Sequence, residues 1–316
     1  MTPHRVFIVG HEGTTGLRIH ERLSDRKDIE LLATADEDRK NVEAIKVVAK
    51  KADLVFLCLP DVASKEIMAA IGDFPCKVID TSTAFRTTAG WAYGFPELGE
   101  SYKTAIATKK HIANPGCHAS GMIACIAPLV KAGLVSVDYP FTITSLTGYS
   151  GGGKKMIGQY ESNPKDYFLY APRQYGLGQE HKHLPEVQHV CGIIEAPIFM
   201  PIVDDYYSGM EVTVGIHSRL CHKPVCIDKV QQTLEYFYKD STIVTVAPFT
   251  ENSNSGMLNA NQLSNTDSMK IYVTGNDERI MVHAIFDNLG KGASGAAVQC
   301  MNIALGLSED TGLVLG

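Results

Sequence analysis

A cysteine directly after a tight turn is the residue of this sequence best suited to covalent chemistry. Residues 114–116 read Asn-Pro-Gly, a turn motif, and an apolar helical pattern follows from Met122 to Leu134. Cys117 is therefore expected at a helix N-terminus, where the helix dipole favours the thiolate form of a cysteine and so makes it a nucleophile. The alternative is a structural role as one more small, buried hydrophobic residue.

A nucleophilic thiol needs a partner that moves protons, and two histidines offer this chemistry. His181 and His183 lie in a stretch rich in glycine and proline, with Glu186 close behind. Imidazole titrates near neutral pH, so either ring could act as acid or base. Two alternatives stay open, namely exposed loop histidines and a metal site that would add His189. The spacing lacks the i, i+4 histidine pair of a helical zinc site, so we expect no metal.

Two further stretches carry groups that could bind an anion. Residues 80–86 follow an expected strand and combine hydroxyls with an arginine, whose guanidinium can grip phosphate or carboxylate with two hydrogen bonds. Residues 148–155 are rich in glycine and hold two lysines that could close over a phosphate. Their composition alone favours an unstructured linker tip. The candidate contacts are Ser82, Arg86, Ser150 and Lys154.

A glycine-rich turn near the start of the chain follows a short strand and opens a helix. Glycines there allow a tight turn and close approach of the backbone to a phosphate, which the helix N-terminus attracts. The spacing is G-x-x-G-x-x-G rather than the common G-x-G-x-x-G, and the alternative is a plain turn. Its position favours dinucleotide binding. The candidate residues are Gly10, Gly13, Thr14, Thr15 and Gly16.

The end of the second strand should distinguish NAD from NADP, and its residues carry both signals. An acid there would bind the ribose 2′-hydroxyl, whereas a basic cluster would take a 2′-phosphate. Asp36 favours NAD, and Arg39 with Lys40 favours NADP. The alternative is a solvated charged loop.

The elements that position these residues follow two patterns. Up to about residue 140, short apolar strands alternate with helices, which indicates a parallel sheet of α/β type. The expected strands there are residues 5–9, 30–35, 54–59 and 77–79, and the helices are 14–23, 41–51 and 63–71. Later strands are longer and more often alternating, which indicates an α+β domain with a mostly antiparallel sheet. These strands are residues 141–146, 193–198, 209–217, 242–247, 270–274 and 279–286, with helices at 227–237 and 293–307.

Composition excludes several classes of protein. The chain has 316 residues, 45% hydrophobic and 20% charged, which is typical of a globular protein of about two domains. A net charge of −6 gives no basic field for nucleic acid, and no apolar run reaches the roughly 18 residues that span a membrane. The start of the chain does not resemble a signal peptide. None of the eight cysteines forms a C-x-x-C pair, which excludes zinc ribbons and thioredoxin-type motifs. A disulfide scaffold would be unusual at this size and cysteine density, so we expect a reducing cytoplasm.

Together these parts predict hydride transfer through a thioester. Cys117 would attack an acyl phosphate, phosphate would leave, and a nicotinamide would reduce the thioester to an aldehyde. A histidine would take the thiol proton and later return it.

The chain resembles the short form of the N-acetyl-gamma-glutamyl-phosphate reductase family of arginine biosynthesis. Five stretches carry this resemblance in order: residues 10–16, 80–86, 114–121, 181–186 and 288–302. It implies a Rossmann-type NADP-binding domain over residues 1–117 and 287–316, with a returning C-terminal helix. It also implies a catalytic, substrate-binding and oligomerisation domain over residues 118–286, and a homodimer or homotetramer.

The resemblance also implies roles for individual residues. Cys117 matches the nucleophile, and the catalytic histidine is His181 or His183. Ser82 and Arg86 match contacts to the substrate phosphate, and Ser150, Lys154 and Glu186 are further candidates for substrate binding. Asn288 and the turn at Gly292 match a contact on the nicotinamide side.

Some positions depart from that family, and rival functions remain. Relatives commonly have Tyr or Phe where this chain has His118, which either adds a third candidate base or fills the aromatic site. Aspartate-semialdehyde dehydrogenase shares the chemistry, but usually has Asn-Cys followed by hydroxyl residues. A non-catalytic dinucleotide sensor would not need a reactive thiol, and a Cys-His hydrolase would not need a cofactor.

Overall fold

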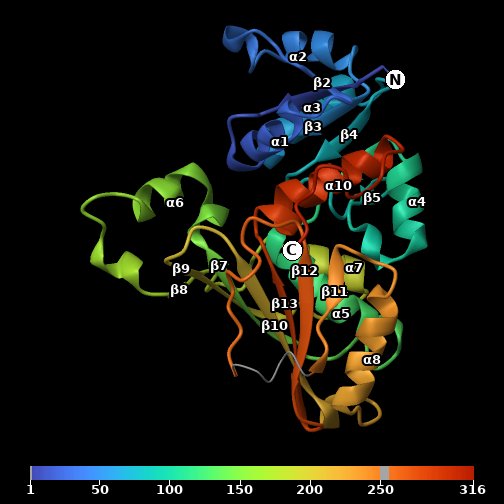
Figure 1. Cartoon of the computed structure of the whole chain (residues 1–316), viewed down its shortest axis with the longest axis vertical. Helices are drawn as coiled ribbons and strands as arrows, with labels where there is room; N and C mark the ends of the chain where they lie inside the picture. The colour runs from blue at the N-terminus through green and yellow to red at the C-terminus, as the bar shows by residue number, and fades with distance from the viewer. Residues whose placement is uncertain (1, 250–255) are drawn as a thin grey trace. The chain divides into compact units, whose positions relative to one another are not determined.

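The computed structural model describes residues 2–249 and 256–316, and the chain divides into two compact units (Figure 1). The first unit combines residues 1–116 with 293–313, and the second combines 117–292 with 314–316. Relative to the boundaries expected above, residue 117, residues 287–292 and the last three residues lie in the second unit.

The first unit is built on sheet A, six parallel strands in the order β2-β1-β3-β4-β6-β5. The strands are β1 (His4–Val9), β2 (Ile29–Leu32), β3 (Leu54–Leu57), β4 (Lys77–Asp80), β5 (Ala92–Tyr93) and β6 (His111–Ala113). The α-helices are α1 (Thr14–Ser24), α2 (Val42–Ala49), α3 (Asp61–Ile71), α4 (Glu100–Thr108) and α10 (Gly295–Ala304).

Helices cover both faces of sheet A because its strands are apolar on both sides. Val6 and Ile8 of β1 share a core with α1, α4 and α10, whereas Phe7 and Val9 share another with α2 and α3. Successive side chains of a strand point to opposite faces, so this alternation produces three layers. The C-terminal helix α10 thus belongs to the core of the first unit.

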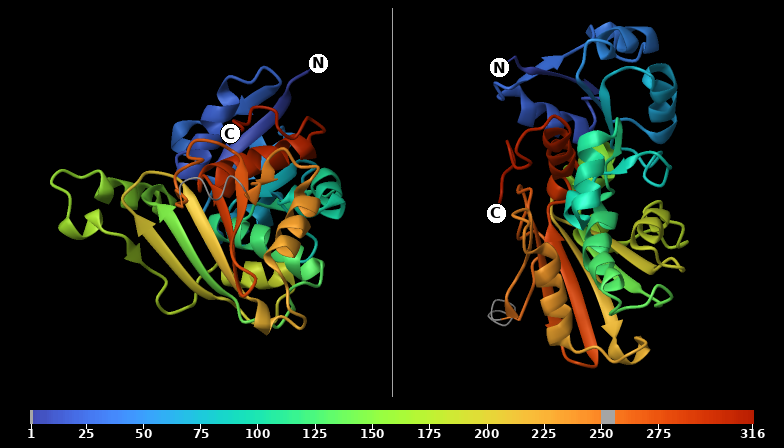
Figure 2. Two further views of the ribbon diagram at one scale, coloured as in Figure 1. Left: turned by 60° about the horizontal axis from the view of Figure 1, so that its bottom comes forward. Right: turned by 90° about the vertical axis from the view of Figure 1, so that its right-hand side faces the viewer.

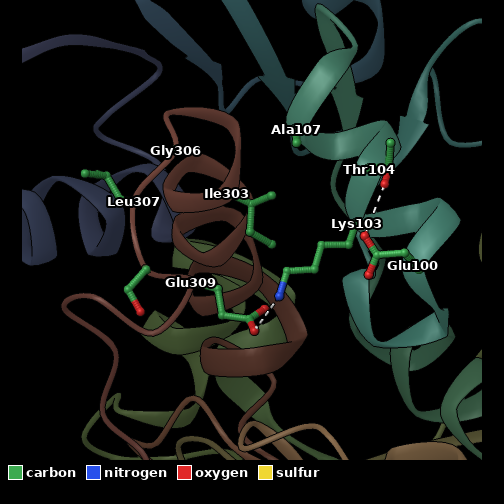
Figure 3. A pocket seen from close by; sticks show the side chains of 9 residues that line it. Glu100, Lys103, Thr104, Ala107, Ile303, Gly306, Leu307 and Glu309 are labelled. Carbon is green, nitrogen blue, oxygen red and sulfur yellow. Dashed lines mark hydrogen bonds and ion pairs between the residues drawn. The ribbon is translucent and has the colours of Figure 1, made fainter.

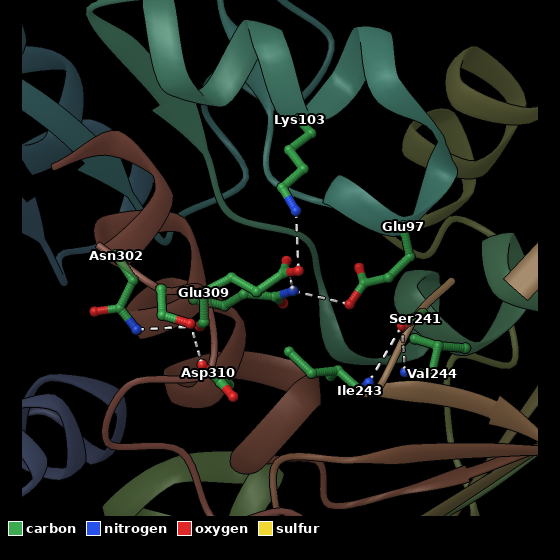
Figure 4. A network of polar contacts seen from close by, with 10 residues as sticks. Glu97, Lys103, Ser241, Ile243, Val244, Asn302, Glu309 and Asp310 are labelled. Atoms are coloured by element: carbon green, nitrogen blue, oxygen red, sulfur yellow. Dashed lines mark hydrogen bonds and ion pairs between the residues drawn. The ribbon is translucent and has the colours of Figure 1, made fainter. Parts of the chain in front are cut away.

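Polar contacts hold the C-terminal segment of the first unit against α4. Lys103 of α4 donates to Glu309 at 3.0 Å, beside a pocket between α4 and the end of α10 (Figure 3). Gln299, which is 1% exposed, donates to Glu97 at 2.9 Å and to Glu309 at 3.3 Å (Figure 4). Asn302 donates to the carbonyl of Glu309 at 3.1 Å. The Lys103–Glu309 and Gln299–Glu97 bonds connect residues 206 and 202 positions apart in sequence.

The second unit is built on sheet B, a mixed sheet in the order β11-β12-β13-β10-β7-β9-β8 (Figure 2). Its β7–β9 and β11–β12 pairs are parallel and its other four are antiparallel. The strands are β7 (Thr142–Gly148), β8 (Arg173–Gln174), β9 (Ile198–Asp204), β10 (Met210–His217), β11 (Val244–Val246), β12 (Met269–Gly275) and β13 (Arg279–Phe286). Its α-helices are α5 (Cys117–Lys131), α6 (Gly153–Tyr160), α7 (Leu184–Cys191) and α8 (Ile227–Tyr238).

One face of sheet B carries helices. Helix α5 packs on β10 and β13, and α8 packs on β11 and β12. A Cβ at Gly121 of α5 would lie 2.5 Å from Val212 of β10, so only glycine allows this close approach. On the opposite face, Leu146 and Ile202 are half-buried and Ile198 is 59% exposed. That face is therefore partly apolar.

Two expectations about local structure were wrong. The expected strand at residues 193–198 begins only at Ile198, because Gly192 ends α7 in the left-handed region and residues 192–197 form the connection to β9. The glycine-rich stretch at 148–155 is not a linker tip. A 3₁₀ turn (Tyr149–Gly152) continues into α6, which projects with residues up to β8 from the edge of sheet B (Figures 1 and 2).

Two further findings concern the described residues as a whole. None of their helices is long and apolar enough to cross a membrane. All eight cysteines are free thiols.

Candidate active site

Cys117 is the first residue of α5, at the helix start that the preceding turn predicted. It is half-buried, whereas the next nine residues of the helix are buried, so the first turn is held firmly by packing. A Cβ at Gly292 would lie 3.1 Å from the Cβ of Cys117. Gly292, expected at the nicotinamide, thus leaves the space beside the thiol open. Near that thiol the first-turn amides of α5 can also attract an anion.

His118 is a buried member of a hydrogen-bonded cluster. Its Nδ1 lies 2.7 Å from the hydroxyl of Ser145 in β7, and its Nε2 lies 2.6 Å from the hydroxyl of Tyr175. Its ring also packs edge-on against Phe199 at 5.3 Å. Burial lowers the pKa of His118 to about 3, and the nearby charges of His181 and Lys182 act in the same direction. His118 is therefore neutral at pH 7 and both of its ring nitrogens are engaged.

His181 and His183 lie in the same cluster. The His181 ring centroid is 5.6 Å from that of His118 and 4.8 Å from that of His183. His183 is 4% exposed, whereas His181 is half-buried. The backbone N–H of His183 donates to Nδ1 of His181 at 3.3 Å. Burial and then Lys182 lower the pKa of His181, which favours a neutral ring at pH 7. Neither histidine is an exposed loop residue.

Helix α7 begins directly after His183, with Pro185 in its first turn and Glu186 in the same turn. Glu186 is 1% exposed and so is part of the packed interior of the second unit. Within the described residues, no group of three histidine, cysteine or carboxylate side chains could hold a metal ion. The arrangement of His181, His183, Glu186 and His189 is accordingly no metal site.

Asn288 and Ser150 are bonded to each other. The Asn288 amide donates to the Ser150 hydroxyl at 3.0 Å and accepts from the backbone N–H of Gly209 at 2.9 Å. Both side chains are 1% exposed. Asn288 therefore fixes the turn that precedes α6, whereas Lys154, in the first turn of α6, is exposed. The buried carboxylate of Asp287 accepts from the backbone N–H groups of Leu289 and Gly290 within its own turn, and its bond from the hydroxyl of Ser208 at 3.0 Å ties the turn to the residues before β10.

The glycine turn of the first unit has the geometry of a phosphate-binding loop. Gly10 has φ = +84°, and a Cβ at Gly16 would lie 2.4 Å from the carbonyl oxygen of Gly10. Gly13 caps α1, whose first turn contains Thr14 and Thr15. The amides of such a first turn have no partner within the helix, so they can bind a phosphate. This cradle suits the pyrophosphate of a dinucleotide.

A pocket lies at the carboxyl ends of β1 and β2, where a dinucleotide fold binds the adenosine ribose. His11, His20, Thr34 and Asp36 are among its lining residues. Arg39 is exposed and pairs with Glu12 of the glycine turn, while Lys40 is exposed. The residue that favours NAD and one that favours NADP thus lie apart. Asp36 lines the pocket, whereas Arg39 pairs with Glu12 at the glycine turn.

Ser82 and Arg86 are bonded within the first unit. The Ser82 hydroxyl donates to Asp80 at 2.6 Å. Arg86, which is 9% exposed, donates from Nε to the carbonyl of Asn114 at 2.9 Å and from Nη2 to that of Thr81 at 3.1 Å. Arg86 thereby supports the turn that leads into residue 117.

The sequence analysis did not identify three residues of the cluster around His118. Ser145, Tyr175 and Phe199 contact His118, but they come from β7, from the residue after β8 and from β9. The charge of the Cys117 thiolate also contributes, after burial, to raising the pKa of Tyr175. Only Tyr175 carried a signal, since it is six residues before His181 in the same polar stretch.

Comparisons with known proteins identify relatives of this chain. The model of the semialdehyde dehydrogenase NAD binding domain matches residues 5–105, and that of the dimerisation domain matches residues 117–288. N-acetyl-gamma-glutamyl-phosphate reductase from a Chelativorans species is 42% identical over 307 residues, covering 95% of this chain and 98% of that protein. N-acetyl-gamma-glutamyl-phosphate reductase 2 from a Nostoc species is 38% identical, covering 99% and 100%.

Solved structures share the fold. Aspartate semialdehyde dehydrogenase II from Vibrio cholerae has a TM-score of 0.72 at 17% identity, covering 96% of this chain and 99% of that one. The Candida albicans aspartate semialdehyde dehydrogenase solved with NADP has a TM-score of 0.66 at 14% identity, covering 96% and 98%. The predicted fold class is confirmed. With relatives 38% and 42% identical over nearly its whole length, this chain belongs to the N-acetyl-gamma-glutamyl-phosphate reductase family.

Proposed function

We propose that the protein reduces N-acetyl-gamma-glutamyl phosphate to N-acetylglutamate semialdehyde and phosphate, with NADPH as reductant. The observation that carries this proposal is Cys117 at the first position of α5, in one unit with the His181 cluster. A thiol at a helix start is a typical nucleophile for acyl transfer, and the imidazoles of the same unit can handle its proton. The names of the relatives supply the substrate.

The thiolate of Cys117 begins the reaction by attacking the acyl carbon. The C=O electron pair moves to oxygen, then returns and expels phosphate, leaving a thioester on Cys117. The cofactor, when bound, supplies two electrons as hydride to the thioester carbon. Collapse of the resulting thiohemiacetal breaks the C–S bond, releases the aldehyde and restores the thiolate.

His181 is proposed as the group that handles protons, because it is half-buried and its lowered pKa keeps it neutral at pH 7. While Nδ1 accepts from the His183 backbone, the neutral ring keeps its proton on Nε2, which suits donation to the acyl oxygen. Taking the thiol proton at Nε2 requires the other tautomer, and a 3.3 Å bond is weak enough to be given up.

The first-unit cradle is proposed to hold NADP(H). The first-turn amides of α1, including those of Thr14 and Thr15, would bind the pyrophosphate, Gly10, Gly13 and Gly16 would shape the turn, and Arg39 or Lys40 would contact the 2′-phosphate. For the acyl phosphate we propose Lys154, whose exposed ammonium is at the start of α6, together with Ser150. Ser82, Arg86 and Glu186 are proposed to support the substrate site through their buried positions.

Aspartate semialdehyde dehydrogenase is the rival with a specific observation in its favour, namely the fold it shares. The reverse reaction separates the two. Reduced nicotinamide is followed by absorbance with N-acetylglutamate semialdehyde or aspartate semialdehyde, each with NADP⁺ and phosphate. We expect a phosphate-dependent signal with the acetylated aldehyde only, lost in Cys117→Ala. A signal with aspartate semialdehyde alone would overturn the proposal.

We also propose a homodimer or homotetramer that works in a reducing cytoplasm. The face of sheet B opposite α5 and α8, with Leu146, Ile198, Ile202 and Met281, supports an interface between copies, and the eight free thiols support the compartment. Sedimentation velocity tests the assembly. Ile198→Glu and Leu146→Glu together should produce monomers, and a wild-type monomer at micromolar concentration would disprove it.

A further inference from the structure

A chain of three side chains connects β7, α5 and the segment after β8 within the second unit. The Ser145 hydroxyl lies 2.7 Å from Nδ1 of His118, and Nε2 of His118 lies 2.6 Å from the hydroxyl of Tyr175. Ser145 and His118 are 0% and 3% exposed, so water cannot satisfy their polar atoms. The polar atoms of Ser145 and His118 must therefore find their partners within this chain.

The buried end determines the direction of the hydrogen bonds. Throughout residues 2–249 and 256–316, His118 is the single hydrogen-bond partner of the Ser145 hydroxyl. A buried O–H that does not donate is costly, so Ser145 donates to Nδ1. A neutral imidazole that accepts at Nδ1 carries its proton on Nε2. His118 therefore donates to the Tyr175 oxygen, and the Tyr175 O–H remains as a donor for another group.

Tyr175 is close to the groups of the proposed reaction. Its ring centroid lies 6.1 Å from that of His181, and a Cβ at the neighbouring Gly176 would lie 3.8 Å from the His181 ring. The Cys117 thiolate is near enough for its charge to act on the phenol. Unlike Ser145 and His118, which are buried, Tyr175 is half-buried.

We propose that Tyr175 is a catalytic residue whose hydroxyl donates a hydrogen bond to the acyl oxygen as that oxygen becomes negative during attack by Cys117. His118 and Ser145 are positioning residues, because they hold the phenol oxygen and leave its proton pointing away from them. A preorganised donor of this kind stabilises the transition state without reorganising during the reaction. The inference rests on the proposed acyl transfer to Cys117, but not on the identity of the acyl group.

A small ester tests this role without cofactor or natural substrate. Cys117 attacks p-nitrophenyl acetate, the carbonyl electrons move to oxygen and return, and nitrophenolate leaves, which is followed by its absorbance. Iodoacetamide alkylates the same thiolate without forming an oxyanion. Tyr175→Phe should slow ester acylation by about 10²-fold, the usual effect of losing one such donor. It should leave the alkylation rate within about twofold of wild type, as should the control Tyr236→Phe on the exposed face of α8.

Two further variants test the positioning residues. Ser145→Ala removes the donor to Nδ1, so the ring can take the other tautomer and accept the Tyr175 proton; we expect slower acylation and unchanged alkylation. His118→Phe should also slow acylation, and the double variant with Tyr175→Phe should be no slower than Tyr175→Phe alone. Additive losses would show that His118 does not act through Tyr175 and would overturn its role.

Two results for Tyr175→Phe would contradict the proposed role of its hydroxyl. Equal loss of acylation and alkylation in Tyr175→Phe would mean that Tyr175 affects the thiol itself, and no loss of either would mean that its hydroxyl is not used. Both overturn the proposal. Circular dichroism shows which variants are folded, and Cys117→Ala gives the rate without the thiol. If wild type acylates normally but does not turn over N-acetylglutamate semialdehyde, the proposed function fails while this inference stands.

Discussion

The Asn288 amide donates a hydrogen bond to the Ser150 hydroxyl, 3.0 Å away, and so connects two buried residues 138 positions apart. The same amide accepts from the backbone N–H of Gly209. Asn288 thereby holds the turn before α6 against β10. Its side chain is committed to this structural task, which makes the turn a fixed part of the second unit.

Asn288→Ala should therefore loosen that turn. It removes two buried hydrogen bonds and leaves the Gly209 amide without its partner, so we expect a loss of about 2 kcal/mol in the free energy of unfolding. Amide exchange should accelerate at Gly209 and across residues 148–152. Urea unfolding and hydrogen exchange measure these effects, with Asn261→Ala, an exposed asparagine, as control. Unchanged exchange at Gly209 would contradict the expectation.

The reactivity of Cys117 can be compared with that of another cysteine of the same chain. Cys226 is exposed whereas Cys117 is half-buried, so accessibility alone favours Cys226. We expect iodoacetamide to modify Cys117 first at pH 7, because the N-terminus of α5 favours its thiolate. Peptide mass spectrometry over time gives both rates. Earlier labelling of Cys226 would refute an activated thiol.

Lys182 should affect the pH dependence of activity through the pKa of His181. Burial and Lys182 lower the pKa of His181, so the neutral ring persists below its ordinary range and activity is lost only as pH falls through the lowered value. Lys182→Gln removes a cation and favours the protonated ring, so the acid limb of kcat/KM should move to higher pH. Lys239→Gln, at the residue after α8, is the control. If the acid limb of the kcat/KM profile does not move, the protonation of His181 does not determine that limb.

His118 should make folding sensitive to acid. Its pKa in the folded protein is about 3, whereas an unfolded histidine titrates near 6.5, so only the unfolded state gains this proton between those values. Stability from this group is complete above pH 6.5 and is lost as pH falls. His118→Phe removes the effect. Between pH 6.5 and 5 the wild type should lose about 2 kcal/mol more than the variant, measured by urea unfolding; parallel losses would argue against it.

The glycine turn offers a matched pair of variants. A Cβ at Gly16 would meet the Gly10 carbonyl oxygen at 2.4 Å, whereas one at Gly13 would meet the same atom at an ordinary 3.5 Å. Gly16→Ala must displace backbone, so we expect a clear fall in melting temperature and weaker NADP binding by calorimetry. Gly13→Ala should keep the melting temperature of wild type. Equal melting temperatures would show that the turn relaxes without cost.

The sequence alone determined the order of elements in the first unit. Alternation between apolar strands and helices depends on local side chains, so β1, β3 and the helices around them were predicted to within a few residues. The Asn-Pro-Gly-Cys run also predicted a cysteine at a helix start, because a turn and an apolar pattern are both local signals. The family followed from five such stretches.

Tertiary structure decided what the polar residues do. Arg86 and Ser82 are bonded to their own unit, and Asn288 holds Ser150, because buried polar groups must find partners and the fold supplies them. The cluster around His118 combines Ser145, Tyr175 and Phe199 from three separate segments. The spacing of these residues in the sequence does not predict that they contact His118. The direction of its hydrogen bonds, and with it the free Tyr175 proton, follows only from the burial of Ser145.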